Sequence, residues 1–325
     1  MKENSWKIIH EELWDSSINR LGNIHFKQLF FWSEVLKLQN WSVVRIKKSS
    51  SKKTIYAQVF YKRYFRTAIF LCPGGPIGDI DILDKSILDF LKSYLNVSLI
   101  YLRINLLSMK NQDHNIMLIN NGFIKPSVLN SKGLSMELNL NKNWKEKINR
   151  SWKRSINKFK HSKFKIIHEK EIDPLEIFHI YRQLEIKKKI HQQFSLMQIK
   201  TIIKNFDKQL VHFKCVDINQ KIICIRTAIV VGQNAWDLFA ANIDTKDSIG
   251  VSHNVFVHLL EHCQTNGVVK YDLSGIDPDK NIGVYNFKKG SGARIVEYFG
   301  EYEQSNSVFL KLFFNLLLRL SKIFK

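Results

Sequence analysis

The stretch 271–301 constrains the fold of this chain more than any other, because its pattern changes three times over a short distance. Residues 268–273 are mostly apolar, as in a buried strand, and a segment rich in Gly, Asp and Pro ends that strand. Residues 282–287 can form one compact turn of helix, and residues 295–299 are again apolar, as in a strand. The stretch therefore predicts a strand, a loop, a short helix and a second strand.

Two adjacent lysines, Lys288 and Lys289, end that short helix between Phe287 and two glycines, Gly290 and Gly292. Glycine reaches backbone conformations that other residues disfavour, so it lets the chain turn directly after the lysines. Two cations in a turn are usually a solvated surface feature. By itself the pair therefore predicts only an exposed turn, and the surrounding pattern decides whether it is more than that.

That pattern resembles the C-terminal signature of the Fem family, the FemABX aminoacyltransferases of peptidoglycan bridge synthesis. The signature has a tyrosine-aspartate strand end, a phenylalanine-lysine turn followed by glycine, and a valine-glutamate-tyrosine strand. The matching residues here are Tyr271, Asp272, Leu273, Gly275, Phe287, Lys288, Lys289, Gly290, Val296, Glu297, Tyr298 and Gly300. The resemblance implies an enzyme that moves an aminoacyl group from aminoacyl-tRNA to an amine of a nucleotide- or lipid-linked peptidoglycan precursor.

The resemblance also implies roles for individual residues of the motif. Lys288 would be catalytic, because a fixed ammonium beside the ester carbonyl stabilises the negative charge that develops as the amine attacks. Phe287 would hold the lysine stem and exclude water. Asp272 would orient the loop. Tyr271, Asp272 and Tyr285 would bind the substrate.

The first half of the chain carries further parts of the same resemblance. Residues 26–41 have apolar side chains at helical spacing, with Gln28 and Trp32 where the family has a glutamine and a tryptophan. Leu29 departs from the family pattern, which has a serine there. The resemblance gives Lys37 a contact with the phosphates of a nucleotide-linked precursor, and an exposed helix lysine is the alternative.

Two more substrate contacts are implied. Paired glycines before Pro76 expose backbone N–H groups that could hold an anion, and Gly75-Pro76 matches a glycine-proline of the family at its substrate cleft. A generic turn is the alternative for this segment. Arg154 falls where the family has an arginine that contacts substrate phosphate, and its planar guanidinium suits bidentate contact with phosphate.

Strand-like and helix-like segments alternate along the 325 residues, which predicts an α/β protein with two domains. The resemblance implies two tandem acyltransferase units of GNAT type. We expect the first unit at 1–149 and the second at 150–302. A C-terminal helix at 303–325 would pack back on the first unit.

The chain has an excess of cations, with 50 Lys and Arg against 29 Asp and Glu and a net charge of +21. An AT-rich genome would raise the lysine content without any function. However, a helix that opens with a capping-box pattern at Asn143 and Glu146 has nine Lys and Arg between Lys145 and Lys165, against one acid. Like charges one turn apart destabilise a helix, and a polyanion would relieve that repulsion. We therefore expect tRNA to bind through Lys153, Lys158, Lys160, Lys187 and Lys188.

The sequence favours a protein without a metal or redox group. The four cysteines are scattered with no CxxC pair, and His253, His258 and His262 share helical spacing without a carboxylate or cysteine to complete a metal site. We expect no cofactor and a cytoplasmic protein without a leader segment. The apolar segment 308–325 contains cations, so it would either dock on the first unit or touch the inner face of a membrane.

Two other functions stay open beside aminoacyl transfer. An N-acyltransferase that uses acyl-CoA would need a glycine-rich loop before a helix to grip the pyrophosphate, and the nearest match, 248–252, has one glycine. A non-catalytic basic module that binds RNA or membrane would keep full binding after loss of Lys288. Aminolysis of an ester needs neither a serine nucleophile nor a metal, and the chain has no Gly-x-Ser-x-Gly, so aminoacyl transfer is the leading hypothesis.

Overall fold

A computed structural model describes residues 5–22, 24–159, 163–243, 248 and 250–323 of the chain. The chain folds into two compact units. Unit 1 comprises Met1–Leu134 and Glu297–Lys325, and unit 2 comprises Ser135–Val296. Both units are mixed α/β, as the alternation of strand-like and helix-like segments predicts.

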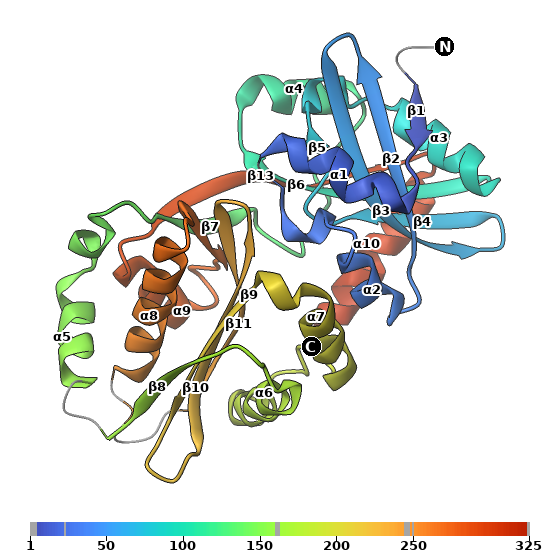
Figure 1. Ribbon diagram of the computed structural model, residues 1–325. Helices are drawn as coiled ribbons and strands as arrows, with labels where there is room; N and C mark the ends of the chain where they lie inside the picture. The colour runs from blue at the N-terminus through green and yellow to red at the C-terminus, as the bar shows by residue number, and fades with distance from the viewer. Residues whose placement is uncertain (1–4, 23, 160–162, 244–247, 249, 324–325) are drawn as a thin grey trace. The chain divides into compact units, whose positions relative to one another are not determined.

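Unit 1 is built on a sheet with the strand order β1-β2-β3-β4-β6-β13 (Figure 1). Neighbouring strands are antiparallel except β4 and β6, which run parallel and are joined by α3. The strands are β1 (Trp6–Ile8), β2 (Ser42–Ser50), β3 (Lys53–Tyr64), β4 (Thr67–Cys72), β5 (Ile77–Gly78, paired with β3), β6 (Leu99–Met109) and β13 (Arg294–Ser305). The helices are α1 (Trp14–Ile18), α2 (Trp32–Lys37), α3 (Ser86–Leu95), α4 (Gln112–Asn120) and α10 (Val308–Ile323).

The side chains of β6 alternate between the two faces of this sheet. Ile100 and Leu102 lie in the main apolar core, which also takes in residues of α3 and α4. Tyr101 and Arg103 therefore point to the opposite face, where α10 packs. Phe314 of α10 lies on the Tyr101 ring with a centroid separation of 4.3 Å. The C-terminal helix is thus part of unit 1.

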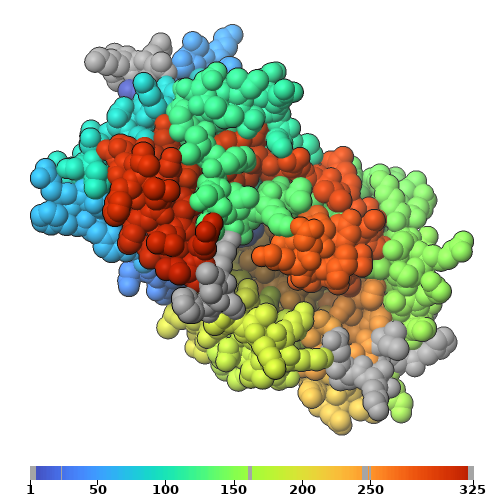
Figure 2. All heavy atoms as spheres, turned by 180° about the vertical axis from the view of Figure 1, so that it is seen from behind, coloured from blue at the N-terminus to red at the C-terminus, as the bar shows by residue number. Residues whose placement is uncertain are grey.

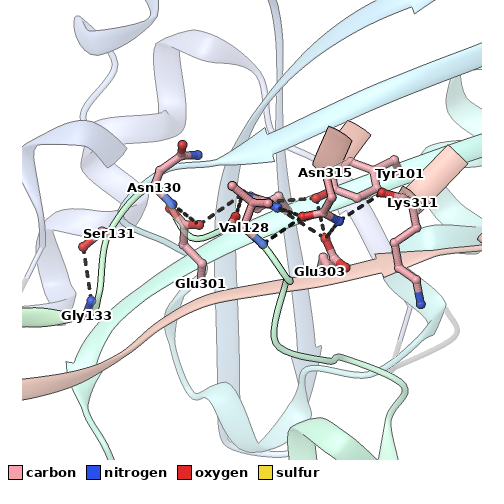
Figure 3. Close-up of polar contacts among 10 residues, drawn as sticks. Tyr101, Val128, Asn130, Ser131, Gly133, Glu301, Glu303, Lys311 and Asn315 are labelled. Atoms are coloured by element: carbon pink, nitrogen blue, oxygen red, sulfur yellow. Dashed lines mark hydrogen bonds and ion pairs between the residues drawn. The ribbon is translucent and has the colours of Figure 1, made fainter. Parts of the chain in front are cut away.

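A buried polar network fastens α10 to that face (Figure 3). The guanidinium of Arg103, which is 4% exposed, donates to Glu301 at 3.1 Å, to Glu303 at 3.3 Å and to the Asn315 amide oxygen at 3.0 Å. The Asn315 amide nitrogen donates to Glu303 at 2.8 Å, and its oxygen also accepts from the Val128 N–H at 3.3 Å. Buried charges need such partners, so the network holds the helix in one position.

Unit 2 has a second sheet, with the strand order β7-β12-β11-β10-β9-β8. Its one parallel pair, among the described residues, is β11 with β12, which α8 joins. Figure 1 shows α5, α8 and α9 on one side of this sheet and α6 and α7 on the other. The strands are β7 (Leu134–Asn139), β8 (Lys165–Glu169), β9 (Leu210–Val216), β10 (Ile222–Val231), β11 (Asn234–Asn242) and β12 (Lys270–Gly275). The helices are α5 (Arg150–Phe159), α6 (Pro174–Lys188), α7 (Leu196–Phe206), α8 (Val251–Thr265) and α9 (Ile282–Gly290).

The two units repeat one order of elements. The antiparallel meanders β2-β3-β4 and β9-β10-β11 are each followed by a helix and by a strand parallel to the last one. A strand from a distant segment then pairs antiparallel with that strand, β13 with β6 and β7 with β12. The boundaries between the two units lie after residue 134 and after residue 296. We expected these boundaries after residues 149 and 302. Pairing between distant segments leaves no local signal in a sequence.

The basic segment forms a shorter helix than its pattern predicts. A 3-10 turn at 144–147 ends where Ile148 becomes extended, with ψ of 128°, and α5 begins at Arg150. Asn149 caps α5, because its side-chain oxygen accepts a hydrogen bond from the Trp152 N–H at 2.9 Å. The expected capping box at Asn143 is wrong, since that side chain makes no capping hydrogen bond.

Candidate active site

A pocket of about 860 Å³ opens in unit 2 where its two parallel strands separate. Asn234–Trp236 of β11 pairs with Lys270–Asp272 of β12. The residues that come next in each strand, Asp237 and Leu273, already line the pocket, together with residues of β10, α5, α6, α8 and α9. The pocket therefore lies at the carboxyl ends of parallel strands, the usual place for a site in an α/β sheet.

Lys288 is a buried cation in the wall of this pocket. It is 7% exposed, and its Nζ donates to the backbone oxygens of Ser274 at 3.1 Å and Gly275 at 2.8 Å, where β12 ends. The pKa of Lys288 is lowered to about 8, mainly by burial. The positive charge of Arg226 also lowers this pKa, and the carboxylates of Asp237 and Asp272 oppose the shift. An ammonium makes three hydrogen bonds, so a third N–H is available to a ligand in the pocket.

An ion pair that the sequence motifs did not indicate forms another wall. Arg226 of β10 donates through Nε to Asp237 Oδ1 at 3.0 Å and through Nη2 to Oδ2, and the Tyr271 hydroxyl donates to Oδ1 at 2.8 Å. The guanidinium also lies 3.9 Å from the centroid of the Phe256 ring. Burial is the main reason that the pKa of Tyr271 lies well above its usual value. The sequence signal was faint: each partner is a lone charge in an otherwise apolar strand.

Phe287 fixes α9 against its neighbours, as part of an aromatic cluster. Its ring lies 4.8 Å from the ring of Trp152 and 5.2 Å from that of His253, centroid to centroid. The next glycine, Gly290, is needed for this approach, since a Cβ there would lie 2.3 Å from Trp152 Cδ1. Lys289, by contrast, is exposed. The aromatic-lysine-lysine-glycine motif thus places one lysine inside the pocket wall and one outside.

Asp272 and Tyr285 were also expected to bind substrate. Asp272 is 5% exposed, accepts hydrogen bonds from the Ser135 hydroxyl and, at 2.7 Å, from the Ser274 N–H, and so holds the turn after β12. Ser274 has a φ of 63°, a conformation that such a side-chain acceptor supports. The Lys289 ammonium lies 5.7 Å from the centroid of the Tyr285 ring. Tyr285 is not among the described residues that line the pocket.

The expected substrate residues of the first half lie in unit 1. Lys37 is half-exposed and pairs with Glu34 at 2.6 Å. The Gly75-Pro76 loop contains a cis peptide bond. Gln28 packs so closely on Gly75 that a Cβ there would lie 2.7 Å from its amide carbon.

Gln28 itself has a structural role in that loop. It is fully buried, donates to Pro73 O at 2.9 Å and accepts from the Gln58 N–H at 2.8 Å. Its amide thus ties the loop to β3. A buried amide needs such partners, so the glutamine of the motif serves the fold of unit 1.

The expected tRNA-binding cations lie on the surface of α5 and at the end of α6. Lys153, Lys158, Lys187 and Lys188 are exposed, and Lys188 also lines the pocket; Arg154, expected to contact substrate phosphate, is exposed on α5 as well. Lys160 lies outside the described residues. Trp152, on the opposite side of α5, is buried against α8 and α9.

The beginning of α8, the nearest match to a pyrophosphate-binding loop, packs against α5 on one side and lines the pocket through Ser248, Gly250 and Ser252. Gly250 has a φ of 83°, and a Cβ there would lie 2.1 Å from the backbone oxygen of Ser155. Asn254, one turn further, donates to the Ile156 oxygen at 3.3 Å. The glycine is therefore needed for contact with α5.

The comparisons with known proteins agree with the motif. Residues 226–317 match the model of the FemAB family, a range that begins at Arg226 and includes Asp237, Tyr271 and Lys288. The match confirms the resemblance that the motif indicates. No curated protein matches the chain.

Several solved structures share the fold. The crystal structure of FemX superposes with a TM-score of 0.74 at 15% identity, covering 92% of this chain and 96% of FemX. The C-terminal domain of an Agrobacterium fabrum protein described as a lysylphosphatidylglycerol synthetase has a TM-score of 0.58 at 12% identity, with 96% of each chain covered. A tandem GNAT protein from the clavulanic acid biosynthesis pathway has a TM-score of 0.55 at 7% identity, covering 94% of this chain and 99% of that one. The chain therefore has a tandem GNAT-like fold, and with the family match this fold supports an acyltransferase.

Proposed function

Because residues 226–317 match the FemAB family model and the chain has a GNAT-like fold, we propose that it transfers an aminoacyl group from aminoacyl-tRNA to an amine of a peptidoglycan precursor. The observation that carries the proposal is the buried ammonium of Lys288 in the wall of the unit 2 pocket, with one N–H left for a ligand. An aminoacyl ester needs such a donor where its carbonyl oxygen gains charge.

The reaction is an ester aminolysis, and its atoms balance without a protein nucleophile. The neutral acceptor amine attacks the ester carbonyl, the new N–C bond forms, and the C–O bond to the tRNA ribose breaks. The proton that the amine loses goes to the departing ribose oxygen. Negative charge collects on the carbonyl oxygen in between, and the third N–H of Lys288 would donate to it there.

Three neighbours keep Lys288 available for this role. The Ser274 and Gly275 oxygens fix its position, and because they are neutral they do not pair with its charge. The nearby carboxylate of Asp237 is already paired with Arg226. Lys288 therefore brings a buried positive charge to the pocket, in addition to the exposed cation of Lys188.

We assign the two substrates to different residues. The exposed cations Lys153, Lys158, Lys187 and Lys188 would bind the tRNA phosphates. Arg154, exposed on α5, would contact a phosphate of the nucleotide- or lipid-linked precursor, and the resemblance gives Lys37, Gly75 and Pro76 of unit 1 as further contacts of that substrate. No cofactor is required, and the cytoplasm, where aminoacyl-tRNA is found, would be the place of reaction.

Acyl-CoA is a weaker candidate for the donor. Its pyrophosphate would need free backbone N–H groups and close approach at the start of α8. There, Gly250 is against Ser155 and Asn254 is bonded to α5. Ser248, Gly250 and Ser252 nevertheless line the pocket, so acyl-CoA remains the second candidate for the donor.

The proposal is tested by incubating the protein with a full set of charged tRNAs and a nucleotide-linked or lipid-linked muropeptide, with mass spectrometry as the readout. We expect the acceptor to gain the mass of one or more aminoacyl residues only when charged tRNA is present. Acyl-CoA replaces the tRNA in a parallel reaction, and product there alone would overturn the proposal. Tight tRNA binding with no product from any acceptor would instead indicate a non-catalytic RNA-binding module.

A further inference from the structure

The C-terminal helix α10 carries a second apolar face that the described residues leave uncovered. Figure 2 shows α10, in the deepest red, lying open to the viewer. The exposed fractions of its outer side chains run from 39% to 75%. These residues are Val308, Phe309, Leu312, Phe313, Leu316, Leu317 and Leu320, and we call them the outer face.

The inner face of α10 is fully used by unit 1. Leu310 is buried, Phe314 lies on Tyr101, and Asn315 belongs to the Arg103 network. A helix face made of large apolar side chains is normally covered. The network also prevents the helix from rotating its outer face inward, because Asn315 would lose its hydrogen bonds to buried charges. The outer face is therefore held open.

The charge of the segment selects the class of partner. Residues 308–325 contain Lys311, Arg319, Lys322 and Lys325 and no Asp or Glu, within a chain of net charge +21. A face that paired with a second copy of itself would bring these like charges together. An anionic surface would instead be complementary to them. An apolar helix face in a segment whose charged residues are all cations is the pattern of helices that lie in the interface of a membrane.

The described part of α10 is shorter than a bilayer core. At 1.5 Å per residue its 16 residues extend about 24 Å, short of the roughly 30 Å of a bilayer core. No helix among the described residues is long and apolar enough to span a membrane. Because its inner face is fastened to unit 1, α10 would lie along a membrane surface.

We propose that the outer face of α10 docks the protein on an anionic lipid bilayer. The docking itself is independent of the transfer reaction. If the proposed function holds, docking also selects the acceptor, because a protein held at the bilayer meets lipid-linked precursor at a higher local concentration than the nucleotide-linked form.

Vesicle sedimentation of the full chain tests the docking. We expect binding to vesicles of phosphatidylcholine with phosphatidylglycerol, and much weaker binding to phosphatidylcholine alone. The double variant Leu312→Glu, Leu316→Glu should lower the partition to anionic vesicles at least about tenfold. The matched control is Ile218→Glu with Leu175→Glu, because both residues are exposed apolar side chains of unit 2, 72% and 44% exposed, and the change of charge is the same.

The outcomes separate the possible occupants of the outer face. Equal loss in both double variants would mean that only net charge matters, and it would overturn the proposal. Unchanged vesicle binding in the α10 variant would also overturn the proposal. Analytical ultracentrifugation would then test whether the outer face is an interface between two copies of the chain, because the variant should in that case change the oligomeric state. Transfer to a nucleotide-linked muropeptide should be unaffected by the α10 variant. If the wild-type protein binds vesicles but transfers nothing, the proposed function fails and the docking surface stands.

Discussion

The two units share a topology, yet their parallel strand pairs differ in length. In unit 1, β4 and β6 stay paired from Thr67–Cys72 along Leu99–Ile104, and their side chains contribute to a filled core. In unit 2, β11 and β12 pair only over Asn234–Trp236 and Lys270–Asp272, and a pocket opens directly beyond. One order of elements thus gives a closed core or a candidate site, depending on where the parallel pair ends.

Each unit also buries an arginine on a strand, with opposite consequences. Arg103 of unit 1 is enclosed by Glu301, Glu303 and Asn315, and it joins a helix to a sheet. Arg226 of unit 2 has a single carboxylate partner, Asp237, and both line the pocket. The first network serves stability, and the second shapes a surface that a ligand can reach.

The largest effect should follow from breaking the unit 1 network. Arg103→Met leaves the carboxylates of Glu301 and Glu303 buried without their cation, which typically costs about 3–5 kcal/mol. We expect urea unfolding to show this loss, and Arg66→Met, at an exposed position, to change the free energy of unfolding by less than about 0.5 kcal/mol. Equal stability of the two variants would contradict a structural role for the network.

Catalysis should depend on the other unit. Lys288→Met removes the donor proposed for the developing oxyanion, so kcat should fall about 10²–10³-fold, while the affinities for tRNA and muropeptide change by no more than a few-fold. Lys289→Met, the adjacent and exposed lysine, is the matched control and should retain near-wild-type turnover. Steady-state kinetics distinguishes the two, and a greater sensitivity of Lys289 would mean that the catalytic cation is misassigned.

Two glycines of α9 should respond with opposite signs. Gly290→Ala places a Cβ 2.3 Å from Trp152, and such overpacking typically costs about 1–3 kcal/mol. Gly283→Ala meets nothing within 4 Å and should stabilise the helix by roughly 0.4–1 kcal/mol. Thermal unfolding measures both. A Gly290→Ala variant as stable as the wild type would mean that α9 does not pack against Trp152 as described.

The buried charge of Lys288 should make stability depend on pH. Its pKa is about 8 in the folded chain against an ordinary value of 10.5, so between these values the unfolded state binds more protons and stability rises with pH. Below pH 8 both states are protonated and the cost of burying the charge is fully present. The free energy of unfolding of the wild type, relative to Lys288→Met, should therefore increase by about 1 kcal/mol for each pH unit in that window. A flat difference would indicate an ordinary pKa.

The smallest effect concerns the basic surface of unit 2. Lys153→Glu with Lys158→Glu should weaken tRNA binding and reduce the slope of log K against log salt by about 0.7–0.9 for each phosphate that the variant no longer neutralises. Lys52→Glu, at an exposed turn of unit 1, should leave the slope unchanged. Binding measured over a range of salt concentrations provides the comparison, and an unchanged slope in the double variant would place the tRNA site elsewhere.

The sequence by itself determined the local parts of this protein. The apolar runs and glycines of 271–301 predicted a strand, a helix and a strand, which the structure has as β12, α9 and β13. The apolar residues of 308–325 predicted a helix, and α10 is there. These features depend on neighbouring residues and on the periods of helices and strands, so the sequence displays them directly.

The tertiary structure alone decided which distant residues meet. It paired Arg226 with Asp237 across two strands, gave Gln28 a structural role beside Gly75, and ended the pairing of β11 with β12 where the pocket begins. It also fastened one face of α10 and left the other exposed. Such contacts join segments far apart in the chain, and the free energy that selects them comes from burial and charge pairing in the folded state, which no local pattern encodes.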